Sequence, residues 1–115
     1  MQKIILDVDT GIDDALAILY AMGDEQAEVI GITTTYGNID LNEATQNTLD
    51  ILQLINTADI PVYKGSLHSL SDEKYIRREV TSRIHGKNGI GDIQIETSAY
   101  KPEKETAVDY LIEAA

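Results

Sequence analysis

Three short apolar runs alternate with two longer segments of helical spacing along the first half of the chain. The runs are residues 3–8, 28–35 and 61–65, and the helical segments are residues 12–22 and 40–55. Apolar and β-branched runs of this length predict strands, the first two of them buried. The order strand, helix, strand, helix, strand predicts βαβ units. We therefore expect an α/β fold with an open, mainly parallel, Rossmann-like sheet and flanking helices.

The two helical segments differ in their apolar pattern. Residues 12–22 are apolar on nearly every side, which predicts a helix that is buried all round. The second segment begins at Asp40 with Glu43 three residues on, a D-x-x-E variant of the capping box. Its apolar residues recur on one face, which predicts a helix packed on one side only.

The periodicity fades between Ser66 and Pro102, and no regular element is expected there. Such a long irregular segment is often functional or mobile. It holds the main basic stretch, around Arg77 and Arg78, which we interpret as a solvated loop face. A last helix is expected to begin near Glu103, and it reaches residues 114–115 without a capping residue, as in a chain cut within an element.

Composition narrows the classes of function. The chain has 115 residues, enough for one domain, and its net charge is −11, so nucleic acid and membrane surfaces are not expected as partners. Cysteine is absent, which excludes disulfides and thiolate metal sites. No apolar run is long enough to span a bilayer. Residues 1–7 do not resemble a signal peptide, so a cytoplasmic location is the default expectation.

Four carboxylates gather where the first predicted strand gives way to the first predicted helix. This acidic motif, residues 7–15, reads D-V-D-T-G-I-D-D-A. A helix dipole favours each nearby negative charge by only about 0.3–1 kcal/mol, whereas an unpaired carboxylate in an apolar setting costs several kcal/mol. Aspartates that merely cap the helix and face water are the alternative. The whole motif between two buried elements favours a cation site instead, and all-oxygen ligands favour Ca²⁺ or Mg²⁺ over Zn²⁺.

Two other motif families fit less well. An EF-hand loop starting at Asp7 requires Gly at its sixth position and Glu at its twelfth, which are Ile12 and Ile18 here. A haloacid-dehalogenase-type phosphatase would use Asp7 and Asp9, but that family expects Thr or Val where this chain has Gly11.

Residues 7–17 resemble the signature D-x-D-x-G-x-D-D-A-x-A of the inosine–uridine-preferring nucleoside hydrolase family. Thr10 is a departure, since family members often carry Pro there. Residues 31–38 are similar to the family's second strand with its terminal Gly-Asn, and residues 84–91 to its I-H-G-x-x-G-[LI]-G loop. We call residues 86–91 the glycine loop. The resemblance covers nearly the whole chain.

The resemblance implies a hydrolase of nucleoside salvage, which cleaves the N-glycosidic bond of ribonucleosides to give ribose and free base. Asp9 and Asp14 would be calcium ligands, with Ca²⁺ favoured over Mg²⁺. Asp9 would also be the base that activates the metal-bound water, and Asp7 would support these ligands. The chemistry is consistent, because cleavage passes through an oxocarbenium-like sugar that carboxylates can stabilise.

Three further residues receive roles from the resemblance. Asp13 would hydrogen-bond the ribose hydroxyls, Asn38 would lie against ribose and the attacking water, and His85 would lie near the leaving base. A lone histidine in a polar loop is usually only solvent-exposed, but the flanking glycines favour a functional His85. His68 has no such context and is interpreted as a surface residue.

Family members are more than twice as long, and their later half supplies further calcium and ribose ligands. We therefore expect residues 1–115 to be a single α/β unit and an N-terminal fragment of a nucleoside hydrolase. Two alternatives stay open: a phosphatase-like hydrolase, and a non-catalytic remnant that associates with other chains through a free sheet edge. The resemblance also implies a homodimer or homotetramer.

Overall fold

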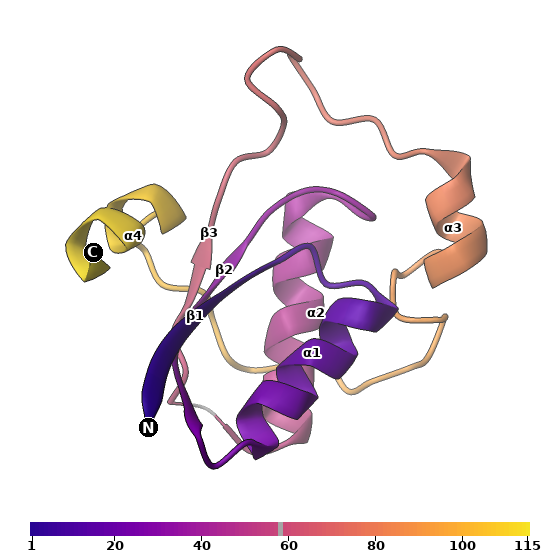
Figure 1. Ribbon diagram of the computed structural model, residues 1–115. Helices are drawn as coiled ribbons and strands as arrows, with labels where there is room; N and C mark the ends of the chain where they lie inside the picture. Colours follow the sequence, from indigo (N-terminus) through magenta and orange to yellow (C-terminus); the bar gives the residue numbers. More distant parts are fainter. Residues whose placement is uncertain (58) are drawn as a thin grey trace.

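The computed structural model describes residues 1–57 and 59–115, which form three strands and four helices (Figure 1). In chain order these are β1 (Gln2–Val8), α1 (Ile12–Gly23), β2 (Ala27–Thr34), α2 (Leu41–Leu54), β3 (Val62–Lys64), α3 (Glu79–His85) and α4 (Ala107–Ala114). The first five elements confirm the predicted βαβαβ order, and their bounds lie within one or two residues of those expected.

The sheet is parallel and open, with the strand order β1-β2-β3. Its register shifts by one residue where Ile4 pairs with Val29 but Ile5 pairs with Gly31. The α/β expectation is confirmed, but β1 is an edge strand of the described sheet, and of its seven residues only Val8 is buried. The prediction of a buried first strand is therefore wrong.

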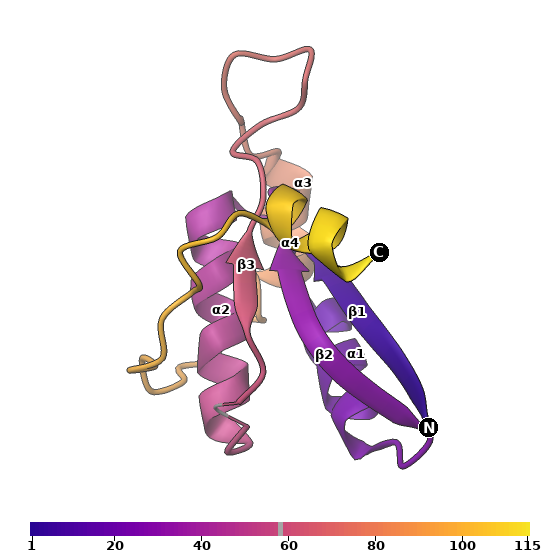
Figure 2. The same ribbon diagram turned by 90° about the vertical axis from the view of Figure 1, so that its left-hand side faces the viewer.

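The sheet lies between two layers of helices (Figures 1 and 2). Helices α1 and α2 cover one face and α4 covers the other. The ring of Tyr110 in α4 stacks on Tyr63 of β3, with centroids 3.9 Å apart, and its hydroxyl donates to the Ile30 carbonyl at 3.2 Å. The main core lies between the sheet and the other two helices, and includes Val8, Ile18, Val29, Ile32, Leu49, Leu52 and Val62.

Helix α1 is buried on one face only. Ile18 and Ala21 are buried, whereas Leu16 and Tyr20 are 63% and 78% exposed. The prediction of a helix buried all round is thus wrong, because only the face toward the sheet and α2 finds packing partners among the described residues.

Helix α2 confirms the predicted cap. The Asp40 carboxylate accepts a hydrogen bond from the backbone nitrogen of Glu43 at 2.8 Å. The helix has nine buried residues, four of them polar or charged: Thr45, Asn47, Thr48 and Asp50. Buried polar groups require hydrogen-bond partners, so this helix must bond to whatever it packs against.

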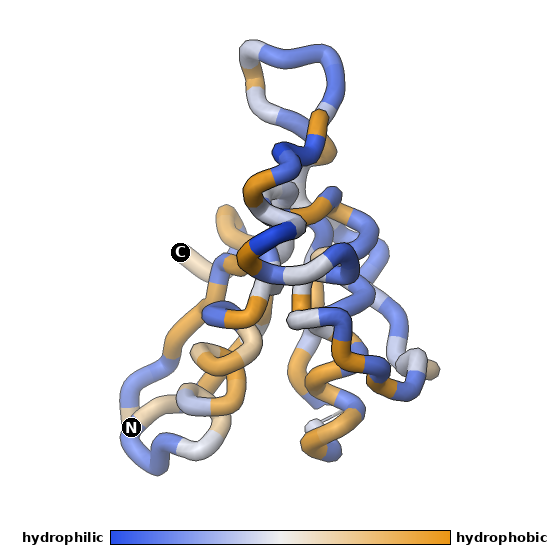
Figure 3. Tube along the Cα trace, turned by 90° about the vertical axis from the view of Figure 1, so that its right-hand side faces the viewer, coloured by the Kyte–Doolittle hydropathy of each residue, from blue (hydrophilic) through white to orange (hydrophobic). Residues whose placement is uncertain are grey.

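The segment between β3 and α4 holds the other differences from expectation. Its first part, beyond the end of β3, is largely hydrophilic (Figure 3). It leads to α3, which no periodicity predicted because none of its residues is buried. Helix α4 begins at Ala107 instead of Glu103, since Thr106 caps it by accepting from the Asp109 nitrogen at 3.2 Å. Among the described residues, no helix is long and apolar enough to cross a membrane.

Candidate active site

The acidic motif forms the turn that joins β1 to α1, at the carboxyl end of the sheet. Val8 ends the strand and the helix begins at Ile12 with Gly11 as its N-cap, so Asp13 and Asp14 fall in the first helical turn as predicted. The backbone nitrogen of Asp9 donates to Oδ2 of Asp14 at 3.0 Å. This bond closes the turn and brings the Asp9 backbone against the Asp14 carboxylate.

Asn38 joins this turn from the end of the next strand. Its backbone nitrogen donates to Oδ2 of Asp9 at 2.8 Å. Gly37 allows that approach, because a Cβ there would lie 2.1 Å from the same oxygen. The structure therefore brings together Asp9, Asp14 and Asn38 where two adjacent parallel strands end, which is the usual place for a ligand in an open α/β sheet.

His85, the last residue of α3, reaches the same turn from a distant part of the chain. Its Nδ1 accepts a hydrogen bond from the backbone nitrogen of Ile12 at 3.1 Å. A neutral imidazole that accepts at Nδ1 carries its proton on Nε2. The His85 side chain is only 14% exposed, and Nδ1 lies 4.0 Å from a carboxylate oxygen of Asp13, whose side chain is 75% exposed. His85 is therefore packed against the acidic motif.

Asp7 lies apart from these residues. Its carboxylate accepts from the hydroxyl of Thr33 at 2.7 Å, and the two residues are register partners on β1 and β2. Because β1 ends at Val8, Asp9 lies beyond the strand. Asp7 lines a separate hollow near α4, together with Thr35 and Gly65.

Burial and the neighbouring carboxylates oppose the ionisation of Asp14. The pKa of Asp14 is raised from 3.8 to about 7, first by burial, then by a side-chain hydrogen bond with Asp9 and by the negative charges of Asp9 and Asp13. The backbone hydrogen bond from Asp9 acts in the opposite direction. Nearby positive charge would therefore favour the ionised form of Asp14.

The donor set fits part of the shell of a hard cation. Asp9 and Asp14 offer hard carboxylate oxygens, whereas Ca²⁺ takes six to eight oxygen ligands. Over residues 1–57 and 59–115, no group of three or more His, Cys, Asp or Glu side chains is placed to hold a metal ion. The two carboxylates are thus suited to contribute to a hard-cation site rather than to complete one.

Residues 75–77 contact two loops beside the site, the one that holds Gly37 and the glycine loop. The sequence pattern did not predict these contacts. The Tyr75 hydroxyl donates to the Gly37 carbonyl at 2.5 Å, and its ring lies 5.7 Å from that of Tyr36. The guanidinium of Arg77 donates to the carbonyls of Gly86 and Lys87. The interpretation of this stretch as a solvated face is therefore wrong for Arg77, which is half-buried, although Arg78 is exposed.

Asn47 and Thr48 of α2 were also missed. The Asn47 side chain donates to the carbonyls of Thr10 and Asn88, and the hydroxyls of Thr48 and Thr10 lie 2.7 Å apart. One sequence signal was available. Asn47 lies beside Ala44 and Ile51 on the core face of an amphipathic helix, where a polar side chain must find a partner.

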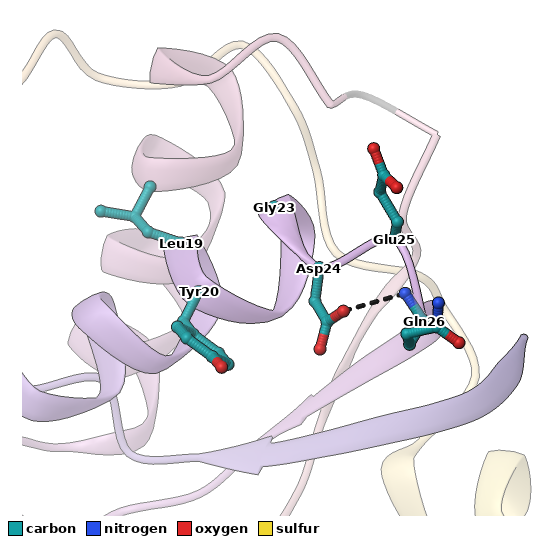
Figure 4. Close-up of a pocket in the computed structure, with 6 residues that line it drawn as sticks. All are labelled: Leu19, Tyr20, Gly23, Asp24, Glu25 and Gln26. Atoms are coloured by element: carbon teal, nitrogen blue, oxygen red, sulfur yellow. Dashed lines mark hydrogen bonds between the residues drawn. The ribbon is translucent and has the colours of Figure 1, made fainter.

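A second hollow lies at the opposite end of α1, between the helix and the turn into β2 (Figure 4). Leu19, Tyr20 and Gly23 form one side of it. Oδ1 of Asp24 accepts from the Gln26 nitrogen at 2.8 Å, a bond that shapes the turn. This hollow is at the amino ends of the strands, away from the acidic motif, so we assign it no chemistry.

Comparison with known proteins shows the family of this chain. A family model described as inosine-uridine preferring nucleoside hydrolase matches residues 4–115. Uridine nucleosidase 1 of Arabidopsis thaliana is 38% identical over 112 residues, 97% of this chain and 32% of that protein. A solved structure of a purine-preferring ribonucleoside hydrolase from Gardnerella vaginalis matches with a TM-score of 0.96 and 44% identity, over 98% of this chain and 36% of that one.

A third relative is short. An uncharacterised protein of Corynebacterium ammoniagenes is 43% identical over 93 residues, which are 81% of this chain and 97% of that protein. In contrast, the chain spans about a third of the length of the plant nucleosidase and of the bacterial hydrolase. The match of the family model over nearly all of the chain shows that this protein belongs to the inosine-uridine preferring nucleoside hydrolase family.

Proposed function

We propose that this chain carries part of the catalytic apparatus of a nucleoside hydrolase, which cleaves the N-glycosidic bond of a ribonucleoside with water. The observation that carries the proposal is the convergence of Asp9, Asp14 and Asn38 at the ends of β1 and β2, with His85 packed against the same turn. Family membership supports it further.

Asp9 and Asp14 would hold a Ca²⁺ ion, since their oxygens suit a hard cation, and its positive charge would favour the ionised form of Asp14, whose pKa burial raises. Ca²⁺ is favoured over Mg²⁺ because it accepts irregular oxygen shells, whereas Mg²⁺ requires a near-octahedral one. When bound, the cation supplies positive charge that eases deprotonation of a nearby water.

The other steps of the reaction would be carried out by side chains of this chain. Asp9 accepts a proton from the attacking water, whose oxygen bonds to the sugar carbon as the bond to the base breaks. Asn38 and the exposed Asp13 orient the water and the ribose hydroxyls. Nε2–H of His85 donates a hydrogen bond to the departing base. This nitrogen is on the opposite side of the ring from Nδ1, which accepts from Ile12. Asp7 supports the end of β1 through Thr33.

The test is ribose release from inosine and from uridine, in Ca²⁺ and in a chelator. Both substrates are needed, because one relative is named for uridine and another as purine-preferring. We expect calcium-dependent release that Asp9→Ala abolishes and Asp24→Ala, in the distant turn, leaves unchanged. Ribose release that is unchanged both by the chelator and by Asp9→Ala would refute the proposal.

A second candidate is a non-catalytic unit that binds cations weakly and associates with other chains. It is favoured by the small donor set, since no group of three or more His, Cys, Asp or Glu side chains among the described residues is placed to hold a metal ion. No ribose release, together with calcium binding that Asp9→Ala weakens, would support it. Light scattering in solution would show whether the chain forms the expected dimer or tetramer. Phosphate release from a generic phosphomonoester would instead favour the phosphatase alternative.

A further inference from the structure

The side-chain amide of Asn47 connects two loops that are far apart in the sequence. Its Nδ2 donates to the carbonyl of Asn88 at 2.8 Å and to the carbonyl of Thr10 at 3.4 Å. Thr10 is in the acidic motif and Asn88 is in the glycine loop. Asn47 itself is 8% exposed, so water does not compete freely for either bond.

A primary amide suits this position because its nitrogen carries two protons, one for each carbonyl. Aspartate has the same shape but offers at most one donor, and leucine offers none. The neighbouring Thr48 completes the attachment, since its hydroxyl donates to the Ala44 carbonyl at 2.8 Å and lies 2.7 Å from the Thr10 hydroxyl. Thr10 is therefore held both by its side chain and by its backbone.

The glycine loop is shaped to approach this amide. A Cβ at Gly89, whose φ is +83°, would lie 3.4 Å from Nδ2 of Asn47 and 2.9 Å from Ile39. The loop also closes back on α3, because the Gly91 nitrogen donates to the His85 carbonyl at 2.6 Å. Movement of Asn88 away from Asn47 would therefore be transmitted to His85.

We infer that Asn47 is a positioning residue that sets the distance between the acidic motif and His85. Thr10 is the neighbour of Asp9, and the glycine loop begins directly after His85. The amide thus links the group proposed to activate water with the group proposed to face the leaving base. This geometry stands on the contacts alone, whereas its catalytic consequence rests on the proposed function.

The unmodified protein provides the first test. Scalar couplings through hydrogen bonds, measured by NMR, should connect the Asn47 side-chain nitrogen with the carbonyl carbons of Thr10 and Asn88. We expect both couplings. Absence of the coupling to either carbonyl would overturn the inference, whether or not the chain hydrolyses nucleosides.

The second test compares Asn47→Asp with Leu49→Ala, which removes packing from the hydrophobic core on the same helix. The readout is the pair of imidazole ¹⁵N shifts of His85 and the amide shift of Ile12. We expect Asn47→Asp to move these signals toward an averaged tautomer, and Leu49→Ala to leave them in place. Equal effects would overturn the inference. If Asp at this position prevents folding, Asn47→Ser, which keeps one donor, replaces it.

Activity separates this inference from the proposed function. If the chain releases ribose, Asn47→Asp should lower kcat about a hundredfold, the cost of a misplacement of about 1 Å, with little change in KM. Leu49→Ala should leave kcat unchanged at a temperature where it is folded. An Asn47→Asp enzyme with normal kcat would overturn the positioning role. Complete lack of activity in every variant would count against the proposed function, and the couplings would still decide the role of Asn47.

Discussion

Nδ1 of His85 lies 3.1 Å from the backbone nitrogen of Ile12 and accepts a hydrogen bond from it, one of the first four N–H groups of α1 that no carbonyl within the helix can accept. The N-cap residue of α1 is Gly11, which has no side chain to offer. A Cβ there would lie 2.7 Å from the same Nδ1, so glycine is what allows the imidazole to approach. His85, which is proposed to face the leaving base, therefore also caps the helix that carries Asp13 and Asp14.

This double role predicts that His85→Ala is destabilising as well as inactivating. Loss of the acceptor leaves the Ile12 N–H without a protein partner, and removal of an N-cap side chain typically costs about 0.5–2 kcal/mol in the free energy of unfolding. Urea denaturation measures it. His68→Ala is the control, because among the described residues the His68 ring has a hydrogen bond only with the adjacent Ser69 carbonyl. Equal losses in the two variants would contradict the capping role.

The raised pKa of Asp14 predicts a pH-dependent stability in the absence of metal. The folded-state pKa, about 7, is above the ordinary value of 3.8, so the folded state holds the proton more tightly than the unfolded state. This contribution to stability is complete below pH 3.8 and is lost as the pH rises through about 7. Asp14→Asn removes the ionisation and should therefore gain stability over the wild type as the pH rises.

Urea denaturation of both proteins in a calcium chelator, at about pH 4 and about pH 8, measures this difference. Asp24→Asn is the comparison at the other end of α1. A difference between wild type and Asp14→Asn that is the same at both pH values would contradict the assignment. Added Ca²⁺ at the higher pH should reverse the order, because it binds the folded wild type and stabilises it by mass action.

Local pattern predicted most of the fold, since β1, α1, β2, α2 and β3 each have a clear apolar periodicity. The local pattern failed for elements whose position or burial depends on tertiary contacts. Helix α3 has no buried face, and its surroundings depend on Arg77, whose guanidinium binds the glycine loop. The apolar surface of α1 predicted burial all round, but composition alone does not say which faces find partners.

In the site too, contacts that are local in sequence could be predicted and contacts between distant residues could not. Asp9 and Asp14 are five residues apart in one turn, so their proximity follows from the motif. The contact between Ile12 and His85 spans 73 residues, and no local pattern predicts it. The family resemblance named His85, whereas Asn47 was missed because its role depends on two loops that meet only in the folded chain.

Gly37 is predicted to be required for the position of Asp9. A Cβ at residue 37 would lie 2.1 Å from Oδ2 and 2.7 Å from Cγ of Asp9, so Gly37→Ala must displace the carboxylate and break its bond from the Asn38 nitrogen. Forcing extra volume into a packed site typically costs about 1–3 kcal/mol. We expect this loss in urea denaturation, and weaker calcium binding by calorimetry.

Gly23→Ala is the matched control for this substitution. No heavy atom lies within 4 Å of a Cβ built at Gly23, and alanine should stabilise the end of α1 by up to about 1 kcal/mol. Calcium binding should be unchanged in this variant. If Gly37→Ala bound calcium as tightly as Gly23→Ala, then Asp9 would not be a ligand in the position seen here.

The hydrogen bonding of the buried Thr10 and Thr48 hydroxyls predicts that replacing each residue by Val costs a different amount of stability. The two oxygens lie 2.7 Å apart, and both side chains are fully buried. The Thr48 proton is committed to the Ala44 carbonyl, so Thr10 is the donor between them. Thr48→Val leaves a buried donor without an acceptor and should cost about 1–3 kcal/mol, whereas Thr10→Val leaves Thr48 bonded to Ala44 and should cost about 0.5–1.5 kcal/mol.

A double-mutant cycle decides whether the hydroxyls act on each other. With both residues changed to Val, no donor is left unpaired, so the loss in free energy of unfolding should be smaller than the sum of the two single losses. Asp40→Ala combined with Thr48→Val gives the additive reference, because the Asp40 cap bonds to Glu43 and not to the Thr10–Thr48 pair. Strict additivity of the two Val substitutions would mean that Thr48 does not anchor the acidic motif, and that Asn47 holds Thr10 by its carbonyl alone.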